Sequence, residues 1–209
     1  GTLYNSYPHI VNAIRRAMEQ FGYTDTEENI RRYARVTVDN ALRHYAPMCG
    51  CTPEQLKYWY RKLVYSISDR VQVYPELPQL LREITLAGGR NHICSNRTAA
   101  CCRAYLERDG LAQYFDVFSG PDVEEGLRFK PEPDLVNVVL KARGIAPSEL
   151  LMVGDRILDL QAAHAAGSPA CFFDPDHFIE TPFETEYVAP TAEDLRRIIF
   201  DGTDLSPDA

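Results

Sequence analysis

Along the first 70 residues, the apolar side chains recur at intervals of three and four, which is the period of an amphipathic helix. This spacing predicts one helix over Pro8–Phe21 and a second, longer helix over residues 27–46. A third helix is predicted to begin at Thr52, because this capping residue is followed by a proline and, three positions on, by a glutamine. We therefore expect residues 5–71 to form an all-helical domain.

After Val71 the pattern changes to short apolar runs that alternate with helical stretches. The predicted strands are 91–94, 114–119, 150–153, 170–173 and 187–188, and the predicted helices are 75–84, 98–106, 134–142, 157–166 and 191–199. Strands that alternate with helices indicate a parallel sheet with right-handed crossovers. The predicted fold of this part is therefore α/β, a Rossmann-like doubly wound parallel sheet, which follows the helical domain along the chain.

The clearest chemical signal lies where the apolar run Leu150–Val153 ends. Gly154 and Asp155 follow this run directly, and Asp159 lies about one helical turn further on. In open α/β sheets, ligands bind at the carboxyl ends of the strands. Two carboxylates at that edge favour a hard cation such as Mg²⁺. The alternative is that Asp155 caps the following helix and Asp159 is solvated.

Two other predicted strand ends carry polar residues that complement these carboxylates. Ser95 and Asn96 follow one strand, and the loop after the next strand leads to Lys130. A hydroxyl and backbone N–H groups at a helix start bind anions, and a lysine supplies a compact positive charge. Together with a metal they would form a phosphoryl site. Taken singly, Ser95 is better explained as a helix cap, and Lys130 as a surface lysine; the combination of all three strand ends favours the phosphoryl site.

Composition narrows the class of protein. The 209 residues are 45% hydrophobic and 25% charged, which is ordinary for a soluble globular chain, and no apolar run reaches the ~20 residues of a membrane span. The net charge of −8 argues against general nucleic-acid binding, which needs a basic face. The six cysteines are irregularly spaced and are expected to be reduced thiols of a cytoplasmic protein.

The motifs resemble the haloacid dehalogenase superfamily, in particular its phosphoglycolate-phosphatase-like members with a helical cap. The matching stretches, which span almost the whole chain, are Gly1-Thr2-Leu3, Tyr74-Pro75 through Gly88, Cys94-Ser95-Asn96-Arg97, Lys130-Pro131-Glu132-Pro133, Val153 through Asp159, and Ala162 through Gly167.

The resemblance implies an α/β core formed by residues 1–4 and 72–209, with the helical cap inserted at residues 5–71. It also implies a role for each matching residue. Ser95 would hold the phosphate, helped by the backbone at Asn96, and Lys130 would neutralise the phosphate and the nucleophile. Asp155 would bind Mg²⁺, with Asp159 supporting it directly or through water. Thr2 would orient the first catalytic loop.

One departure from the family pattern affects the chemistry. The family's first motif is an apolar strand followed by Asp-x-Asp-Gly-Thr-Leu, whereas this sequence starts at Gly1-Thr2-Leu3. The two aspartates would be the nucleophile and the general acid/base. The tail motif Asp201-Gly202-Thr203-Asp204 has a different order and follows a helix, so it is not expected to replace them. We expect the sequence to be a fragment that is inactive alone, whose strands 91–94 and 150–153 flank the place of the absent strand.

The resulting functional prediction is a Mg²⁺-dependent phosphatase that hydrolyses a small phosphomonoester through an aspartyl-phosphate. Its partner would be a small phosphorylated metabolite, with no nucleic acid or membrane involved, and the protein would be a monomer or homodimer. A phosphomutase or dehalogenase of the same superfamily is an alternative, and so is a non-catalytic phosphate-binding protein if Gly1 is the natural start.

Overall fold

The computed structural model describes residues 1–65, 71–122, 126–176 and 184–202. Part of the helical domain predicted over residues 5–71, part of the loop before Lys130, and Thr203 and Asp204 of the tail motif lie outside these ranges. The chain divides into two compact units, a helical unit of Gly1 and Leu3–Tyr74 and an α/β unit of Thr2 and Pro75–Ala209.

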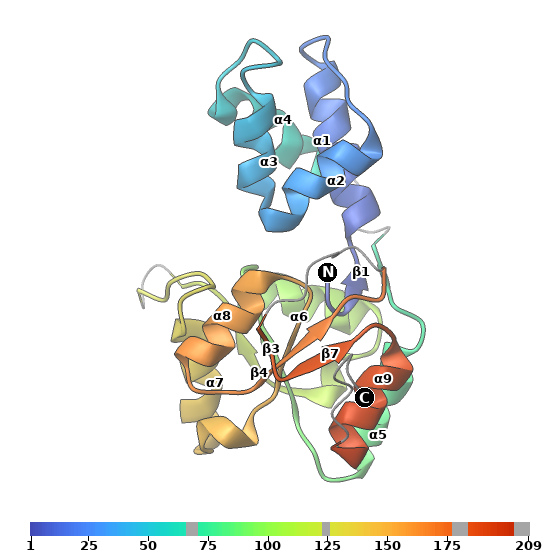
Figure 1. Ribbon diagram of the computed structural model, residues 1–209, viewed down its shortest axis with the longest axis vertical. Helices are drawn as coiled ribbons and strands as arrows, with labels where there is room; N and C mark the ends of the chain where they lie inside the picture. The colour runs from blue at the N-terminus through green and yellow to red at the C-terminus, as the bar shows by residue number, and fades with distance from the viewer. Residues whose placement is uncertain (66–70, 123–125, 177–183, 203–209) are drawn as a thin grey trace. The chain divides into compact units, whose positions relative to one another are not determined.

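Within its described residues, the helical unit has four α-helices and a short antiparallel ribbon. Figure 1 shows these elements. The helices are α1 (Tyr7–Glu19), α2 (Glu27–Val36), α3 (Val38–Tyr45) and α4 (Pro53–Tyr65). The ribbon pairs β1 (Tyr4–Asn5) with β2 (Gln72–Val73), so that the two ends of the helical segment lie side by side. The sequence pattern did not predict this ribbon, because strands of two residues leave no alternation to detect.

The prediction of a single helix over residues 27–46 is wrong, because the helix is interrupted at Thr37 and the segment forms α2 and α3. Thr37 has extended backbone angles, with φ −156° and ψ 159°. Its hydroxyl accepts a hydrogen bond from the backbone N–H of Asn40 at 2.9 Å. Thr37 thus caps α3, and the capping bond satisfies a backbone donor at the start of that helix.

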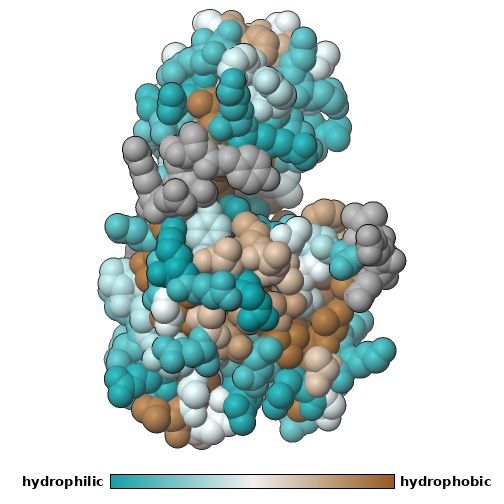
Figure 2. Space-filling view, turned by 180° about the vertical axis from the view of Figure 1, so that it is seen from behind, coloured by the Kyte–Doolittle hydropathy of each residue, from teal (hydrophilic) through white to brown (hydrophobic). Residues whose placement is uncertain are grey.

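The core of the helical unit lies between its four helices. Several large side chains there are almost fully buried, and they come from all four helices: Val11, Ile14, Met18, Ile30, Leu42, Tyr45 and Leu56. The Tyr45 hydroxyl donates to a carboxylate oxygen of Asp25 at 2.9 Å. The face of this unit seen in Figure 2 is mainly hydrophilic, as expected when the apolar stripe of each helix faces inward.

The α/β unit alternates strands and helices along the chain. Its strands are β3 (Asn91–Cys94), β4 (Phe115–Ser119), β5 (Met152–Gly154), β6 (Ala170–Phe173) and β7 (Tyr187–Ala189). Its helices are α5 (Leu77–Leu86), α6 (Ala99–Arg108), α7 (Asp134–Arg143), α8 (Ile157–Ala165) and α9 (Ala192–Asp201). In Figure 1 the strands lie between α7 and α8 on one side and α5 and α9 on the other.

The strands of the α/β unit are parallel but form two separate ladders. One ladder pairs β3 with β4, and the other has the order β5-β6-β7. Within the described residues, no ladder joins β3 to β5. Cys94, at the end of β3, packs against apolar residues of β5, β6, α7 and α8. Side-chain packing at Cys94 therefore connects the two ladders, although no ladder hydrogen bonds join them within the described residues.

Among the described residues, no helix is long and apolar enough to cross a membrane. All six cysteines are free thiols.

Candidate active site

The end of β5 meets the start of α8 in a turn that depends on Gly154. A Cβ placed on Gly154 would lie 2.2 Å from the Cβ of Asp159 and 2.7 Å from its Cγ. One carboxylate oxygen of Asp159 accepts from the backbone N–H of Arg156 at 3.1 Å, which closes the first turn of α8. The glycine thus lets Asp159 fold back against the strand, and Asp159 is only 4% exposed.

This arrangement overturns both alternatives for the aspartates. Arg156, not Asp155, is the N-cap residue of α8. Asp159 is buried rather than solvated. The sequence separation of four residues placed Asp159 correctly on the first turn of the helix, where its carboxylate also satisfies a backbone donor.

Lys130 lies beside Asp159 in the interior of the α/β unit, so its interpretation as a surface lysine is wrong. Its Nζ lies 2.5 Å from Oδ1 of Asp159 and donates to the carbonyl oxygen of Cys94 at 2.8 Å. Lys130 is 8% exposed. Burial alone would lower the pKa of this lysine, but the charge of Asp159, its hydrogen bond with Lys130 and the charge of Asp155 more than offset burial and hold the pKa above its usual value.

Asn96 joins the end of β3 to the loop that carries Lys130. Its Oδ1 accepts from the backbone N–H of Lys130 at 2.7 Å, and its Nδ2 donates to the backbone carbonyl of Lys130 at 3.1 Å. The sequence predicted only that the backbone of Asn96 would contribute to a phosphate site. The side-chain contact spans 34 positions, and no local spacing signals it.

Ser95 follows β3, and both its backbone N–H and its hydroxyl form hydrogen bonds with backbone groups of other residues. Its N–H donates to the carbonyl of Ser119 at 3.0 Å, and its Oγ accepts from the N–H of Arg97 at 3.1 Å. Burial raises the pKa of the Cys102 thiol, and a hydrogen bond with Ser95 partly counteracts this. The side-chain cap of α6 is Thr98, which accepts from the N–H of Cys101 at 3.3 Å. Ser95 is therefore not the cap of this helix.

Asp155 is held by a residue from the start of the chain. The Thr2 hydroxyl donates to Oδ1 of Asp155 at 2.6 Å. The other carboxylate oxygen lies 3.8 Å from Nε of Arg156. The structure thus brings Thr2 to Asp155, and it brings Asn96, Lys130 and Asp159 together, while the charge of Asp155 acts on Lys130.

The predicted magnesium ligands differ in how well they fit a metal. Within the described ranges, no group of three His, Cys, Asp or Glu side chains is placed to hold an ion. Magnesium commonly binds proteins through only one or two carboxylates, with water and substrate phosphate completing its shell. Asp155 fits that chemistry. Asp159 fits a supporting position better than a direct ligand, because the buried ammonium group of Lys130 already lies 2.5 Å from its Oδ1 and its other oxygen accepts from the N–H of Arg156.

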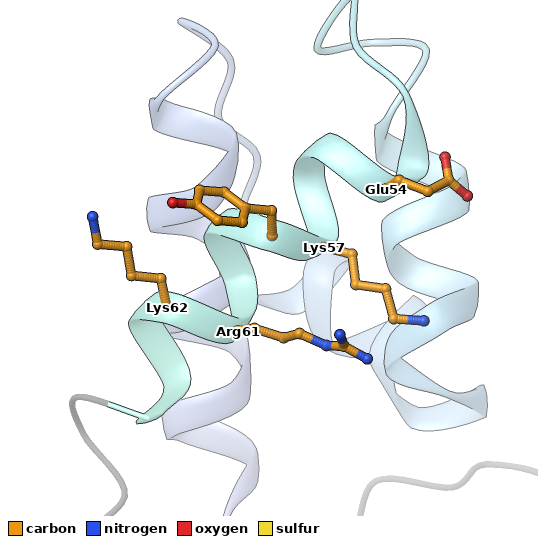
Figure 3. A pocket seen from close by; sticks show the side chains of 5 residues that line it. Glu54, Lys57, Arg61 and Lys62 are labelled. Carbon is orange, nitrogen blue, oxygen red and sulfur yellow. The ribbon is translucent and has the colours of Figure 1, made fainter.

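Two other regions, a surface pocket and the tail motif, do not, within the described residues, bring together side chains from different elements as the strand ends do. A pocket on α4 is lined by Glu54, Lys57, Tyr58, Arg61 and Lys62 (Figure 3). All five belong to one helix, and Lys57 forms an ion pair with Asp39 at 2.9 Å.

The tail motif begins where α9 ends: Asp201 is the last helical residue, and Gly202, with a φ of +62°, is its left-handed cap. This position is typical of a helix stop.

Comparisons with known proteins identify the family of the chain. A family model described as haloacid dehalogenase-like hydrolase matches residues 1–173, and the chain belongs to that family. It is similar to a phosphoglycolate phosphatase of Vibrio parahaemolyticus, with 32% identity over 178 residues that cover 80% of this chain and 77% of that protein. A phosphoglycolate phosphatase of Yersinia pseudotuberculosis is 30% identical over 179 residues, covering 81% and 75% of the two chains.

Among solved structures, a predicted phosphoglycolate phosphatase from Haemophilus somnus superposes with a TM-score of 0.78. The match covers 97% of this chain and 94% of that one at 19% identity, so it shows the shared fold. The predicted superfamily, the α/β fold class and the assignment as a hydrolase of this family are confirmed. The chain is a haloacid dehalogenase-like hydrolase that is similar to phosphatases.

Proposed function

We propose that this protein is a Mg²⁺-dependent phosphatase that hydrolyses a small phosphomonoester, with phosphoglycolate the first substrate to test. The observation that carries the proposal is the position of Lys130, whose buried ammonium group bonds the carbonyl at the end of β3 and the carboxylate of Asp159. An ammonium group has three donors, and these two contacts leave one for an oxygen of the substrate. The similarity to phosphoglycolate phosphatases supports the same substrate class.

Each residue then has a defined task. Ser95, with the N–H groups at the start of the following segment, would bind the phosphate oxygens, and Lys130 would offset their charge. Asp155, oriented by the Thr2 hydroxyl, would hold Mg²⁺. When bound, the ion would supply positive charge beside the phosphate. The site places positive charge where negative charge grows in phosphoryl transfer, a reaction whose catalysis is mainly positioning and charge stabilisation.

The proposed nucleophile is the first aspartate of the family's Asp-x-Asp motif, and it is inferred from the family resemblance. The resemblance implies an Asp-x-Asp segment and its strand between β3 and β5, which share no ladder within the described residues. The first aspartate would attack phosphorus and expel the alcohol, and water would then release phosphate and regenerate the carboxylate. The small phosphorylated substrate, the cytoplasmic location and the monomeric or dimeric state are parts of the same proposal.

The test uses the 209-residue chain extended by an apolar strand and Asp-x-Asp before Gly1. We expect it to release inorganic phosphate from a panel of small phosphomonoesters when Mg²⁺ is present. The Lys130→Met variant should lose at least about 100-fold in kcat/KM, since charge stabilisation of this kind is worth that much. An extended chain that folds but hydrolyses no ester would contradict the proposal and favour a non-catalytic phosphate-binding protein.

A further inference from the structure

We infer that Asn96 is a positioning residue for Lys130, a role that rests on the proposed phosphatase function. Its side-chain amide makes two hydrogen bonds to the backbone of Lys130, accepting from N–H at 2.7 Å and donating to C=O at 3.1 Å. A primary amide presents an acceptor and a donor side by side. Asn96 can therefore hold both backbone groups of one residue, which a carboxylate or a hydroxyl does less completely.

The two ends of Lys130 are fixed by the same short segment. Asn96 holds its backbone, while the carbonyl of Cys94 accepts from its Nζ at 2.8 Å. A lysine has a long, flexible stem that loses rotamer entropy when it is immobilised. Anchoring both ends fixes that stem in one conformation. Asp159 then adds an opposite charge from the β5 side at 2.5 Å.

The residue between these two anchors is Ser95. Cys94, Ser95 and Asn96 are consecutive. This tripeptide therefore sets the distance between the Ser95 hydroxyl, which is proposed to bind phosphate, and the ammonium group of Lys130. Substrate groups must meet catalytic groups within about 0.5 Å of the productive geometry. We therefore infer that Asn96 keeps the ammonium group at a fixed position relative to the Ser95 hydroxyl, and acts on the reaction only through Lys130.

The first test is a mutant cycle in the extended chain, with phosphate release as the readout. Asn96→Ala should lower kcat/KM about 10- to 100-fold, the usual effect of removing a group that orients a functional residue. In a Lys130→Met background, Asn96→Ala should change the rate by less than about 2-fold, because no ammonium group remains to be positioned. Asn96→Asp keeps the acceptor but loses the donor, so its rate should fall between those of wild type and Asn96→Ala.

The matched control is Asn137→Ala, since Asn137 is an exposed asparagine on α7 and its loss should leave the rate unchanged. Independent effects of Asn96→Ala and Lys130→Met that simply multiply would overturn the inference. That result would mean that Asn96 acts on the fold in general.

A second test needs no catalysis and uses the 209-residue chain itself. The Lys130 amide, bonded to Asn96, should exchange with solvent at least about 10-fold faster in Asn96→Ala than in wild type, with little change in the strand amides. Inorganic phosphate should also bind more weakly to the variant. Unchanged exchange at Lys130 would overturn the inference. If the extended chain hydrolyses nothing while exchange responds as stated, the phosphatase proposal fails but the contact between Asn96 and Lys130 stands.

Discussion

The ammonium group of Lys130 lies 2.5 Å from the carboxylate of Asp159, and both residues are almost completely buried. The pair joins the loop before α7 to the first turn of α8. Each partner also forms a hydrogen bond with the backbone: Lys130 donates to the carbonyl of Cys94, and Asp159 accepts from the N–H of Arg156. A buried charge pair with its remaining groups satisfied is tolerated, whereas either charge left alone is costly.

Replacement of Asp159 by asparagine should destabilise the protein strongly. The variant leaves the Lys130 charge buried without its counter-charge, which costs about 3–5 kcal/mol in comparable pairs. The free energy of unfolding, measured by urea denaturation, checks the prediction. The matched control is Asp39→Asn, which breaks the exposed pairs with Lys57 and Arg43 and should cost at most about 1 kcal/mol. Equal losses in the two variants would contradict the proposed energetic difference.

The same pair predicts a loss of stability at alkaline pH. The pKa of Lys130 is raised in the folded protein above its usual value of 10.5, because the surrounding negative charges outweigh burial. Its contribution to stability is complete below that value and is lost as the pH rises through the raised folded pKa. Denaturation measured between pH 9 and 12 should therefore show a decline above about pH 10.5 that is smaller in Lys130→Met.

Much of this arrangement follows from local sequence patterns. The parallel strands and their helices were predictable because apolar runs and helix stops repeat along residues 72–209. Asp155 and Lys130 were identifiable because they follow strand ends, and in parallel sheets these ends meet at one edge. The helix spacing also placed Asp159 one turn into α8.

Other features depend on contacts that local spacing does not encode. The amide of Asn96 reaches across 34 positions to Lys130, and the pairing of Asp159 with Lys130 rather than with solvent follows from tertiary packing. The break at Thr37 was missed because the helical period continues through it, although its capping bond to Asn40 overrides that period. The short ribbon between β1 and β2 has too few residues to give a periodic signal.

Gly154→Ala should displace Asp159 and lower stability. The new Cβ would lie 2.2 Å from the Cβ of Asp159, a near-backbone atom that cannot rotate away. Overpacking of this kind costs about 1–3 kcal/mol, and we expect the upper end of that range. Gly144→Ala is the comparison, since a Cβ there meets open space and only its φ of +62° is unfavourable. A smaller loss for Gly154→Ala than for Gly144→Ala, measured by thermal denaturation, would argue against the close approach.

Tyr45→Phe should weaken the helical unit by about 1 kcal/mol, the typical value of one hydrogen bond. The Tyr45 hydroxyl is buried and donates to Asp25 at 2.9 Å. Hydrogen bonds from Asn29, Thr26 and Tyr45 hold the pKa of Asp25 below its usual value of 3.8. The stability from these bonds is present above that value and is lost as the pH falls through the lowered pKa.

The difference between wild type and Tyr45→Phe should therefore shrink below about pH 3.8. The control is Tyr58→Phe, because the Tyr58 side chain is largely exposed. A difference that stays constant down to pH 2 would show that the hydrogen bond to ionised Asp25 is not its source.

Thr2→Val in the extended chain should raise the Mg²⁺ concentration needed for half-maximal activity about 10-fold, because groups that orient a metal ligand commonly contribute that much. Valine keeps the shape of threonine but removes the donor that lies 2.6 Å from Asp155. Thr2→Ser retains the hydroxyl and should bind Mg²⁺ nearly as well as wild type. Equal magnesium dependence in the valine and serine variants would remove Thr2 from this role.

The most direct test of the central claim is the rate of phosphate release from phosphoglycolate by the extended chain, measured as a function of Mg²⁺ concentration in wild type and Asp155→Asn. The proposed site predicts saturable activation by Mg²⁺ in wild type, no activity after chelation, and a loss of activation in Asp155→Asn. Phosphate release that is unaffected by Mg²⁺, or Asp155→Asn activity that saturates like wild type, would contradict a magnesium-dependent phosphatase site at the end of β5.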